Sequence, residues 1–429
     1  MKSVAFFLDN SAISSIDCSN IVLGNPGIGG TENLIILVST LLSIRNKIKV
    51  KLFVQTEGTF PSVLDVVKID NFVDAYKQAK NNKYDYLIFR NSPEYINTIA
   101  FTDTNSNTKL IPWCHNFGSY KDLDRYSKSK NVARIVCVGK EQMDRYRDLQ
   151  AFYKSEYIYN CIFIPDQDTD NIKLIPANNR PNIVTYMGSL VSEKGFHVLA
   201  HAWPEIVKCV KDAQLYVVGS GKLYSRDAKL GDFGIAEESY EKSFVGSLLD
   251  KDGTLMKNVH FLGILGDEKR ELLMKTKVGV PNPTGKTETF GLSAVEMQIF
   301  GANVVTKECP GFMDTVKLGC LYKYESELAS CVVEKLMNPD CNYNNARRFI
   351  IENFSYTAVI KEWETLLLDA IPNNRRLHCL KLENPFYHIK WIKEGVRRLK
   401  KIVPLFNCIL PPIERIYNYF HSLIRKCKM

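Results

Sequence analysis

The sequence predicts an α/β protein made of two doubly wound domains that face each other across a cleft. Short apolar strands alternate with helical patterns along most of the chain, and this alternation favours parallel sheets covered on both faces. At 429 residues the chain is also too long for a single hydrophobic core, so two domains are expected. A polar stretch at residues 166–180 separates two such series and is interpreted as the linker between the domains.

The first series predicts an N-terminal domain over residues 1–165. Its helix at residues 31–44 is apolar nearly throughout, so we expect it to be buried. The predicted strands of this domain are short apolar runs at residues 4–8, 50–55, 86–89, 110–113 and 134–138.

The second series predicts a C-terminal domain over residues 181–355, followed by a closing helix over residues 356–371. Residues 222–257 are long for a connection inside such a domain, and we interpret them as a lid or an insertion. Ligands of doubly wound domains bind at the carboxyl ends of the strands, so a ligand is expected in the cleft. The predicted helices lie at residues 195–210 and 268–277, and the predicted strands at residues 183–187, 215–218, 259–262 and 302–306.

The composition is that of a folded globular protein, with 45% hydrophobic and 24% charged residues. The longest apolar run, residues 34–42, is too short to cross a bilayer, and the N-terminus lacks the pattern of a signal peptide. The twelve cysteines show neither a CxxC pair nor a zinc-binding spacing, so we interpret them as reduced thiols. Together these features predict a cytoplasmic protein.

The net charge of +9 is concentrated at the C-terminal end. Residues 385–429 hold ten Lys and Arg residues against two acidic residues, which accounts for +8 of the total. The rest of the chain is therefore close to neutral, and this argues against a nucleic-acid partner.

Residues 281–305 give the strongest functional indication. They pass from a Pro/Gly loop into an apolar-periodic helix, with Glu288 just before the helix and Glu296 inside it. The helix dipole and the first amides can hold a phosphate, while the carboxylates can bind hydroxyls. This combination suits a sugar nucleotide, which carries hydroxyls at both ends and a diphosphate between them. The amides concerned are those of Phe290, Gly291 and Leu292.

Three further elements place small or basic residues where predicted strands end. In the sequence GIGGTE, Gly29 and Gly30 precede a helix and let the backbone approach an anionic ligand. Lys194 stands at the start of another helix, where its charge can neutralise a diphosphate, and Gly219 ends a strand where a base or ribose typically rests. The alternative interpretation is a simple turn for the glycines and a solvated side chain for Lys194.

Together these elements resemble the family-four retaining glycosyltransferases, which have the GT-B fold. The resemblance is strongest over residues 188–315, where GSLVSEKG, LYVVGSGK, VHFLGIL, VGVPNPTGKTETFGLSAVE and GANVV follow in the family's order. The N-terminal GGTE and residues 354–367 extend the similarity to about residues 1–371. The members that it resembles are those that build bacterial surface polysaccharides and lipid-linked glycans.

The resemblance implies a role for each candidate residue. Glu288 would bind hydroxyls of the donor sugar, and Glu296 would bind the ribose hydroxyls. Lys194 would counter the charge that grows on the leaving diphosphate. Gly29 and Gly30 would close over the donor from the other domain. The amides implied at the diphosphate are those of Phe290, Gly291 and Leu292.

His115 is the candidate that the N-terminal domain contributes to the chemistry. It ends a predicted strand in the sequence PWCHN and matches the family's cleft histidine near the reacting sugar carbon. The alternative is a histidine that is packed or on the surface. Ser189 stands where the family usually has an arginine that binds phosphate together with the lysine. This departure puts phosphate affinity in question unless Lys286 or Lys222 substitutes.

The tail, residues 372–429, carries two basic amphipathic helical patterns. Apolar positions between Ile389 and Val403 form one stripe with basic residues on the flanking and opposite faces, and a second stripe follows Pro412. The pattern predicts helices that lie on an anionic membrane surface, where each Lys or Arg contributes about 1 kcal/mol. The alternative is a helical hairpin packed on the body or on a second copy.

The sequence thus predicts a peripheral glycosyltransferase on the cytoplasmic face of the cell membrane. It would move a hexose or a derivative from a nucleotide diphosphate sugar to a lipid-linked or other glycan acceptor, with retention of configuration. No metal or other cofactor is expected. Two alternatives stay open, namely a sugar-nucleotide epimerase of the same fold and a catalytically silent, membrane-associated scaffold.

Overall fold

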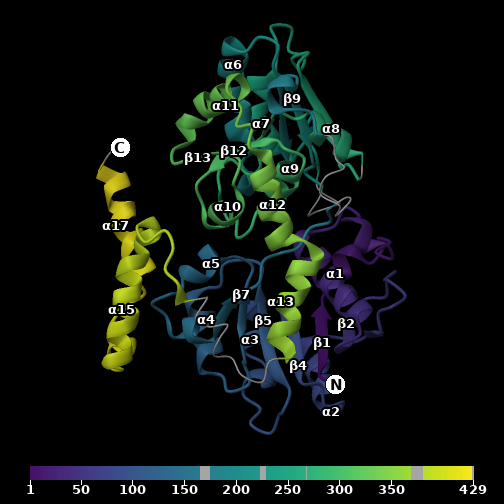
Figure 1. Cartoon of the computed structure of the whole chain (residues 1–429), viewed down its shortest axis with the longest axis vertical. Coiled ribbons are helices and arrows are strands. Elements are labelled where there is room, and N and C mark those ends of the chain that lie inside the picture. The colour runs from purple at the N-terminus through teal and green to yellow at the C-terminus, as the bar shows by residue number, and fades with distance from the viewer. Residues whose placement is uncertain (165–173, 223–228, 267, 369–379, 428–429) are drawn as a thin grey trace.

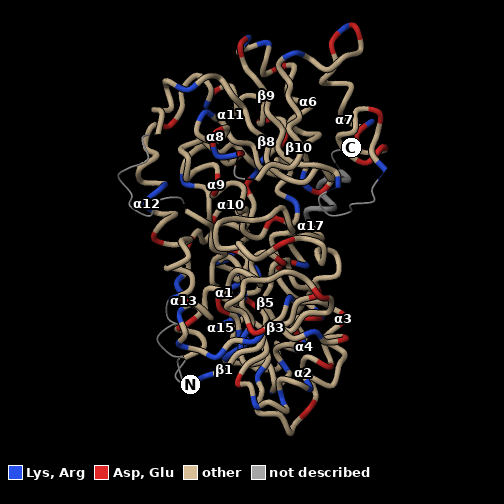
Figure 2. The backbone as a smooth tube through the Cα atoms, turned by 90° about the vertical axis from the view of Figure 1, so that its right-hand side faces the viewer, with Lys and Arg blue, Asp and Glu red and all other residues tan. Residues whose placement is uncertain are grey.

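The computed structural model confirms the predicted architecture of two parallel-sheet domains, stacked one above the other in Figure 1. It describes residues 1–164, 174–222, 229–266, 268–368 and 380–427. The predicted linker at residues 166–180, the insertion at residues 222–257 and the tail therefore lie partly outside the described residues. Lys and Arg are interspersed with Asp and Glu over both domains in Figure 2.

The N-terminal domain is built on seven parallel strands in the order β3-β2-β1-β4-β5-β6-β7. The chain reverses its direction of travel across the sheet between β1 and β4, which is where doubly wound domains bind ligands. The strands β3 and β7 were not predicted, because each contains a charged residue and neither forms a fully apolar run. The strands are β1 (Ser3–Leu8), β2 (Lys49–Val54), β3 (Val66–Lys68), β4 (Tyr86–Arg90), β5 (Lys109–Cys114), β6 (Ile135–Cys137) and β7 (Ser155–Tyr157).

Helices cover both faces of this sheet, so its central strands are apolar on both sides. The whole of β1 from Val4 to Leu8 is buried, and α1 is buried along most of its length as its composition predicts. This helix ends at Asn46, which adopts the left-handed conformation that closes many helices. The helices of the domain are α1 (Gly30–Arg45), α2 (Phe72–Asn81), α3 (Pro93–Ile96), α4 (Tyr120–Lys128) and α5 (Lys140–Asp144).

The C-terminal domain repeats this plan with six parallel strands in the order β10-β9-β8-β11-β12-β13. Its strands are β8 (Ile183–Met187), β9 (Gln214–Val218), β10 (Val259–Gly263), β11 (Val278–Gly279), β12 (Asn303–Lys307) and β13 (Gly319–Tyr322). Its helices are α6 (Phe196–Cys209), α7 (Glu238–Phe244), α8 (Lys269–Lys275), α9 (Leu292–Ile299), α10 (Pro310–Thr315) and α11 (Leu328–Met337).

Two helices then carry the chain back to the N-terminal domain, α12 (Tyr343–Phe354) and α13 (Tyr356–Leu368). In α13, Trp363 is fully buried and meets Trp113 edge to face with ring centroids 4.8 Å apart. At the solvent edge of the same contact, Glu364 accepts hydrogen bonds from Arg45 of α1 at 2.5 and 3.1 Å. The predicted closing helix is therefore α13, which packs against the N-terminal domain.

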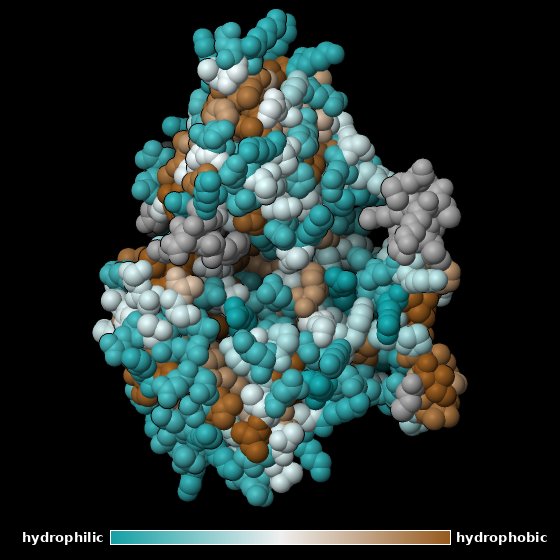
Figure 3. Space-filling view, turned by 180° about the vertical axis from the view of Figure 1, so that it is seen from behind, coloured by the Kyte–Doolittle hydropathy of each residue, from teal (hydrophilic) through white to brown (hydrophobic). Residues whose placement is uncertain are grey.

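The tail forms α15 (Lys390–Ile402), α16 (Phe406–Ile409) and α17 (Ile413–Cys427), which lie beside the N-terminal domain in Figure 1. The expected helices are present, but the expected outward display of basic side chains is wrong for three of them, Lys390, Lys393 and Lys400, which are buried. They turn toward acidic and carbonyl groups of the body, while large apolar side chains gather on the outer side in Figure 3. No helix in the described part of the chain has both the length and the apolar character needed to cross a bilayer.

Candidate active site

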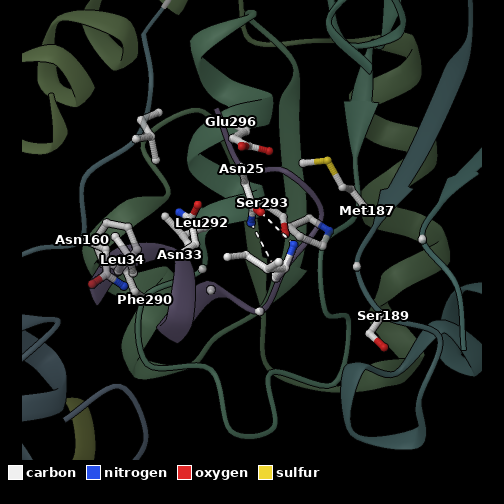
Figure 4. Close-up of a pocket in the computed structure, with 18 of the residues that line it drawn as sticks. Asn25, Asn33, Leu34, Asn160, Met187, Ser189, Phe290, Leu292, Ser293 and Glu296 are labelled. Atoms are coloured by element: carbon white, nitrogen blue, oxygen red, sulfur yellow. Dashed lines mark hydrogen bonds between the residues drawn. The ribbon is translucent and has the colours of Figure 1, made fainter. Parts of the chain in front are cut away.

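A cleft of about 700 Å³ lies between the carboxyl ends of the two sheets, and both domains line it. Figure 4 shows Leu292, Ser293 and Glu296 of α9 in this cleft together with Asn25 and Asn33 of the N-terminal domain. Every residue predicted for the site lines this one cleft. These residues are Gly29, Gly30, His115, Ser189, Lys194, Gly219, Glu288, Phe290, Gly291, Leu292 and Glu296.

Glu288 is held in place from two sides. Its Oε2 atom accepts hydrogen bonds from Lys194 Nζ and Asn282 Nδ2, both at 2.9 Å, and the side chain is only 14% exposed. Burial by itself would raise the pKa of this carboxyl, but the Lys194 charge, the two hydrogen bonds and the Gly291 amide hold the pKa below its ordinary value. Glu288 is therefore an ionised acceptor that can bind hydroxyls. Sequence reasoning missed Asn282.

The backbone around Lys194 brings this residue to the cleft. A short 3-10 turn (Ser192–Lys194) ends at Gly195, whose φ of 69° lies in the left-handed region. A Cβ atom at Gly195 would lie 2.9 Å from the Thr284 amide nitrogen, so only glycine lets this turn approach the loop that carries Glu288. The same turn starts α6, and the local sequence thus positions the ammonium group of Lys194 beside Glu288.

The start of α9 presents main-chain amides to the cleft. Gly291 precedes the helix with a φ of 87°, and a Cβ atom there would lie 2.5 Å from the ring of Phe312. Within the described part of the chain, the amides of Leu292 and Ser293 have no hydrogen-bond acceptor, as expected for the first turn of a helix. Together with the helix dipole, these donors form a site for an anion.

The start of α1 faces the start of α9 across the cleft. A Cβ atom at Gly30 would lie 3.5 Å from Leu292 Cδ1, so the two helices from different domains nearly touch at their N-termini. Both Gly29 and Gly30 line the cleft, and Gly29 is the N-cap residue of α1. The N-terminus of α9 contributes a positive field to the cavity, whereas at α1 the carboxylate of Glu32 in the first turn offsets the helix dipole.

His115 follows β5 and is buried at the bottom of the cleft. Its carbonyl oxygen accepts a hydrogen bond from Thr289 Oγ1 at 2.5 Å, which joins the N-terminal domain to the loop after Glu288. Its Nε2 atom has no hydrogen-bond partner among the described residues. Burial, with a smaller effect of Arg90, lowers the pKa of His115 to about 3, so the ring is neutral at pH 7. The ring packs against Trp113 with ring centroids 4.4 Å apart and its Nε2 atom is buried, so the alternative of a packed histidine also describes this residue.

Glu296 lies on α9 beside Lys269, a residue that sequence reasoning did not single out. Lys269 Nζ donates to the two carboxylate oxygens of Glu296 at 3.2 and 3.1 Å. Lys269 and Arg270 both line the cleft, and Arg270 also donates to the Leu23 carbonyl of the other domain at 3.3 Å. Nothing in the local sequence EKRELL distinguishes these two residues from an ordinary exposed helix start.

The missing arginine at Ser189 is not replaced by the residues that we expected. Lys286 and Lys222 are exposed and do not line the cleft. Ser189 itself is buried, and its hydroxyl points to the Ser220 carbonyl oxygen at 3.4 Å. The additional positive charge in the cleft comes instead from Lys269 and Arg270 of α8, both far from Ser189 in the sequence.

The glycine at position 219 is required by close packing of strand ends. Gly219 has a φ of 140°, and a Cβ atom there would overlap the Gly188 carbonyl group. Its amide donates to the Gly263 carbonyl oxygen at 2.8 Å, so the ends of β8, β9 and β10 form one continuous floor. This floor borders the cleft where a nucleotide base or ribose was expected.

Residues 181–338 match the family model described as glycosyl transferases group 1. This part of the chain is therefore similar to group 1 glycosyltransferases. The matched segment contains Ser189, Lys194, Gly219, Glu288 and Glu296, so the C-terminal half of the cleft lies within it. No curated protein sequence matches the chain.

Solved structures of glycosyltransferases share the fold of nearly the whole chain. HepE from Anabaena, in complex with UDP and glucose, is similar with a TM-score of 0.59 and 16% identity over 86% of this chain and 100% of that chain. A glycosyltransferase from Rickettsia africae gives a TM-score of 0.61 and 14% identity over 86% and 99% of the two chains. The catalytic domain of starch synthase IV from Arabidopsis thaliana, bound to ADP and acarbose, gives 0.55 and 12% over 86% and 99%. The two domains therefore have the GT-B fold.

Proposed function

We propose that this protein is a glycosyltransferase that moves a hexose or a derivative from a nucleotide diphosphate sugar to a lipid-linked or other glycan acceptor. The observation that carries the proposal is the convergence of ionised Glu288, Lys194 and two helix N-termini in one cleft. Carboxylates suit sugar hydroxyls, whereas cationic and amide groups suit a diphosphate. The group 1 domain over residues 181–338 supports the same assignment.

The donor is proposed to span the cleft. The ribose hydroxyls would bind Glu296 and replace part of its ion pair with Lys269. The ammonium group of Lys269 would then face the phosphates. The amides of Leu292 and Ser293 would hold the diphosphate from one side, and the start of α1 would cover it from the other. Glu288 and neutral His115 would then contact the hydroxyls of the transferred sugar.

The reaction is proposed to proceed with retention of configuration and without a metal or other cofactor. The bond between the anomeric carbon and the diphosphate oxygen breaks, and the acceptor oxygen forms its bond on the same face of the sugar. The acceptor proton passes to the departing diphosphate. Lys194, Lys269 and the helix amides supply the positive field that stabilises the charge developing on that group.

The scaffold and epimerase hypotheses receive no comparable support. The scaffold hypothesis was motivated by Ser189, but Lys269 and Arg270 add positive charge to the same cleft. An epimerase would need neither a glycan acceptor nor a tail that presents apolar side chains outward. We therefore retain transfer as the proposed reaction.

The protein is proposed to work on the inner face of the cell membrane, held there by its tail. A lipid-linked acceptor cannot leave the bilayer, so an enzyme that uses one gains from residing at the membrane surface. The exposed residues Trp391, Leu399 and Ile402 of α15 support an interfacial location, and the exposed Arg398 and Lys401 suit anionic headgroups.

The test is transfer by a Glu288→Gln variant. The amide keeps the size of the side chain but loses the charge, so we expect transfer to fall by at least about 100-fold while the fold survives. Glu205→Gln is the matched control, because Glu205 is exposed on α6 of the same domain and does not line the cleft. Full activity of the Glu288 variant with a radiolabelled sugar nucleotide and membrane lipid acceptor would refute the assignment.

A further inference from the structure

The tail is attached to the body through its charged residues rather than its apolar ones. Lys390 is 1% exposed, and its ammonium group donates to the two carboxylate oxygens of Glu141 in α5 at 2.7 and 2.8 Å. Glu394, one turn further along α15, accepts a hydrogen bond from the buried Arg147 at 3.0 Å. An ordinary surface helix packs its apolar stripe on the core and turns its charges to water. Helix α15 instead buries charged residues against the body, while Trp391, Leu399 and Ile402 are exposed and the other residues of its apolar stripe are half-buried.

The second tail helix joins the same charged contact. Lys393 of α15 is fully buried and donates to Glu414 of α17 at 2.5 Å, and Glu414 also accepts from Arg145 of the body at 2.9 Å. Lys400 donates to the Asp148 carbonyl oxygen at 2.9 Å. Turning either helix over would leave these buried charges without partners, which is far more costly than exposing apolar side chains. The orientation of the tail is therefore fixed.

The opposite side of the tail is an exposed apolar surface, visible as brown patches on α15–α17 in Figure 3. We call it the tail apolar surface. Ile402 is 78% exposed and Trp391 54% exposed, values that are unusual for such side chains on a folded protein. The surface consists of Trp391, Leu399, Ile402, Leu405, Ile409, Ile416, Tyr419 and Phe420.

We infer that the tail apolar surface inserts into the interfacial layer of a phospholipid bilayer, while the charged residues of the tail serve as a clamp to the body. This inference rests on the membrane location in the proposed function and identifies the chemistry of the contact. The main contribution is the burial of apolar side chains among the acyl chains, not attraction between a basic face and anionic lipid. Aromatic residues such as Trp391 and Tyr419 suit the boundary between headgroups and acyl chains.

The charges around this surface favour a bilayer over a second copy of the chain. Among the described side chains of residues 390–420, those that are both charged and exposed are Arg398, Lys401 and Arg415, and all are basic. The two acidic residues of this range, Glu394 and Glu414, are buried in the clamp. A two-fold pairing of this surface with itself would bring like charges together without acidic partners. Lipid phosphates supply the complementary charge.

The experiment is co-sedimentation of the full chain with vesicles of phosphatidylcholine alone and with added phosphatidylglycerol, at 0.1 and 0.5 M salt. We expect binding to both kinds of vesicle, with a change of less than about threefold in 0.5 M salt, because apolar insertion is not screened. Leu399→Ser with Ile402→Ser should weaken binding to both by at least about 10-fold. The matched control, Lys401→Gln with Arg415→Gln at two exposed basic residues of the tail, should leave binding to phosphatidylcholine unchanged.

Three outcomes would overturn the inference. The first is binding that requires phosphatidylglycerol and disappears in 0.5 M salt, which would indicate attraction to anionic lipid only. The second is a wild-type dimer in analytical ultracentrifugation that becomes monomeric in the Leu399/Ile402 variant. The third is a monomer that binds neither vesicle. Transfer activity is measured separately, since vesicle binding by a chain without transfer activity would refute the proposed reaction and leave this inference standing.

Discussion

At the scale of single residues, the surroundings shift the pKa values of two carboxylates in opposite directions, Glu288 in the cleft and Asp314 between the domains. Glu288 stays ionised because Lys194 and Asn282 contact it. Asp314 of α10 lies at the interface between the domains, where its Oδ2 atom accepts a hydrogen bond from the Glu141 amide at 2.9 Å. Burial, and then the nearby charge of Glu141, raise the pKa of Asp314 to about 8. Glu288 is therefore ionised at pH 7, whereas Asp314 is mainly protonated.

Asp314 should make stability depend on pH. Its native pKa lies above its ordinary value of 3.8, so the native state binds the proton more tightly and loses stability as pH rises from about 4 to 8. Asp314→Asn mimics the protonated carboxyl and should lack this loss. We expect the variant's advantage in free energy of unfolding to grow by about 1–3 kcal/mol between pH 5 and pH 8, measured by urea denaturation. An advantage that is the same at both pH values would show that Asp314 is ionised in the native protein.

Sequence reasoning found the residues of the cleft that belong to motifs and missed those that the fold brings in. Glu288, Glu296 and Lys194 stand out because helix starts and glycines surround them in the sequence. Lys269 reaches Glu296 only because α8 and α9 lie side by side at the cleft. The expected substitutes for the missing arginine were wrong because nearness in sequence to a loop does not determine which side chains face its ligand.

At the scale of elements, the buried ion pairs between the tail and the N-terminal domain contribute to the stability of the folded protein. Lys390→Met removes the positive charge between Glu141 and Asp144, so that these two buried carboxylates lose their ion-pair partner on the tail. We expect a loss of about 3–5 kcal/mol, as for other broken buried ion pairs. The loss is measured as a lower urea midpoint and faster proteolytic removal of the tail.

Lys401→Met is the control for this change, because Lys401 is an exposed residue of the same helix. Its effect should stay within about 0.5 kcal/mol. Equal stability and equal tail cleavage of the two variants would show that the Lys390 contact does not hold the tail to the body.

The helices of the tail were predictable, but their orientation was not. The spacing of three and four residues identifies an apolar face and a basic face, and it says nothing about which face meets the body. That choice depends on the acidic residues of α5 and on Arg147, which lie about 250 positions away in the sequence. Strands β3 and β7 escaped prediction because their residues, VVK and SEY, do not form a fully apolar run, whereas the equally short β6 has the apolar sequence IVC.

At the scale of the whole molecule, one arrangement links the cleft to the tail. The start of helix α5 lies against the loop that follows Glu288, since a Cβ atom at its N-cap residue Gly139 would lie 2.9 Å from the Thr289 carbonyl oxygen. On its other side, Glu141 of α5 binds Lys390 of the tail. The surface proposed for the membrane and the residues proposed for catalysis are therefore both attached to α5, and on our proposal this helix would set the orientation of the cleft relative to the bilayer.

The measurement that tests the central claim most directly is a thermal-shift titration with UDP-, GDP-, ADP- and CMP-sugars. We predict that one of them stabilises the protein, by about 2.7 kcal/mol at 100 times its dissociation constant. Lys194→Gln and Lys269→Gln should each weaken binding of that ligand by about 10-fold, since each removes a charged group that the proposed binding mode places at the phosphates. Lys211→Gln, at an exposed site of the same domain, should not. A folded protein whose stability none of these sugar nucleotides changes would contradict the claim that the cleft binds an activated sugar.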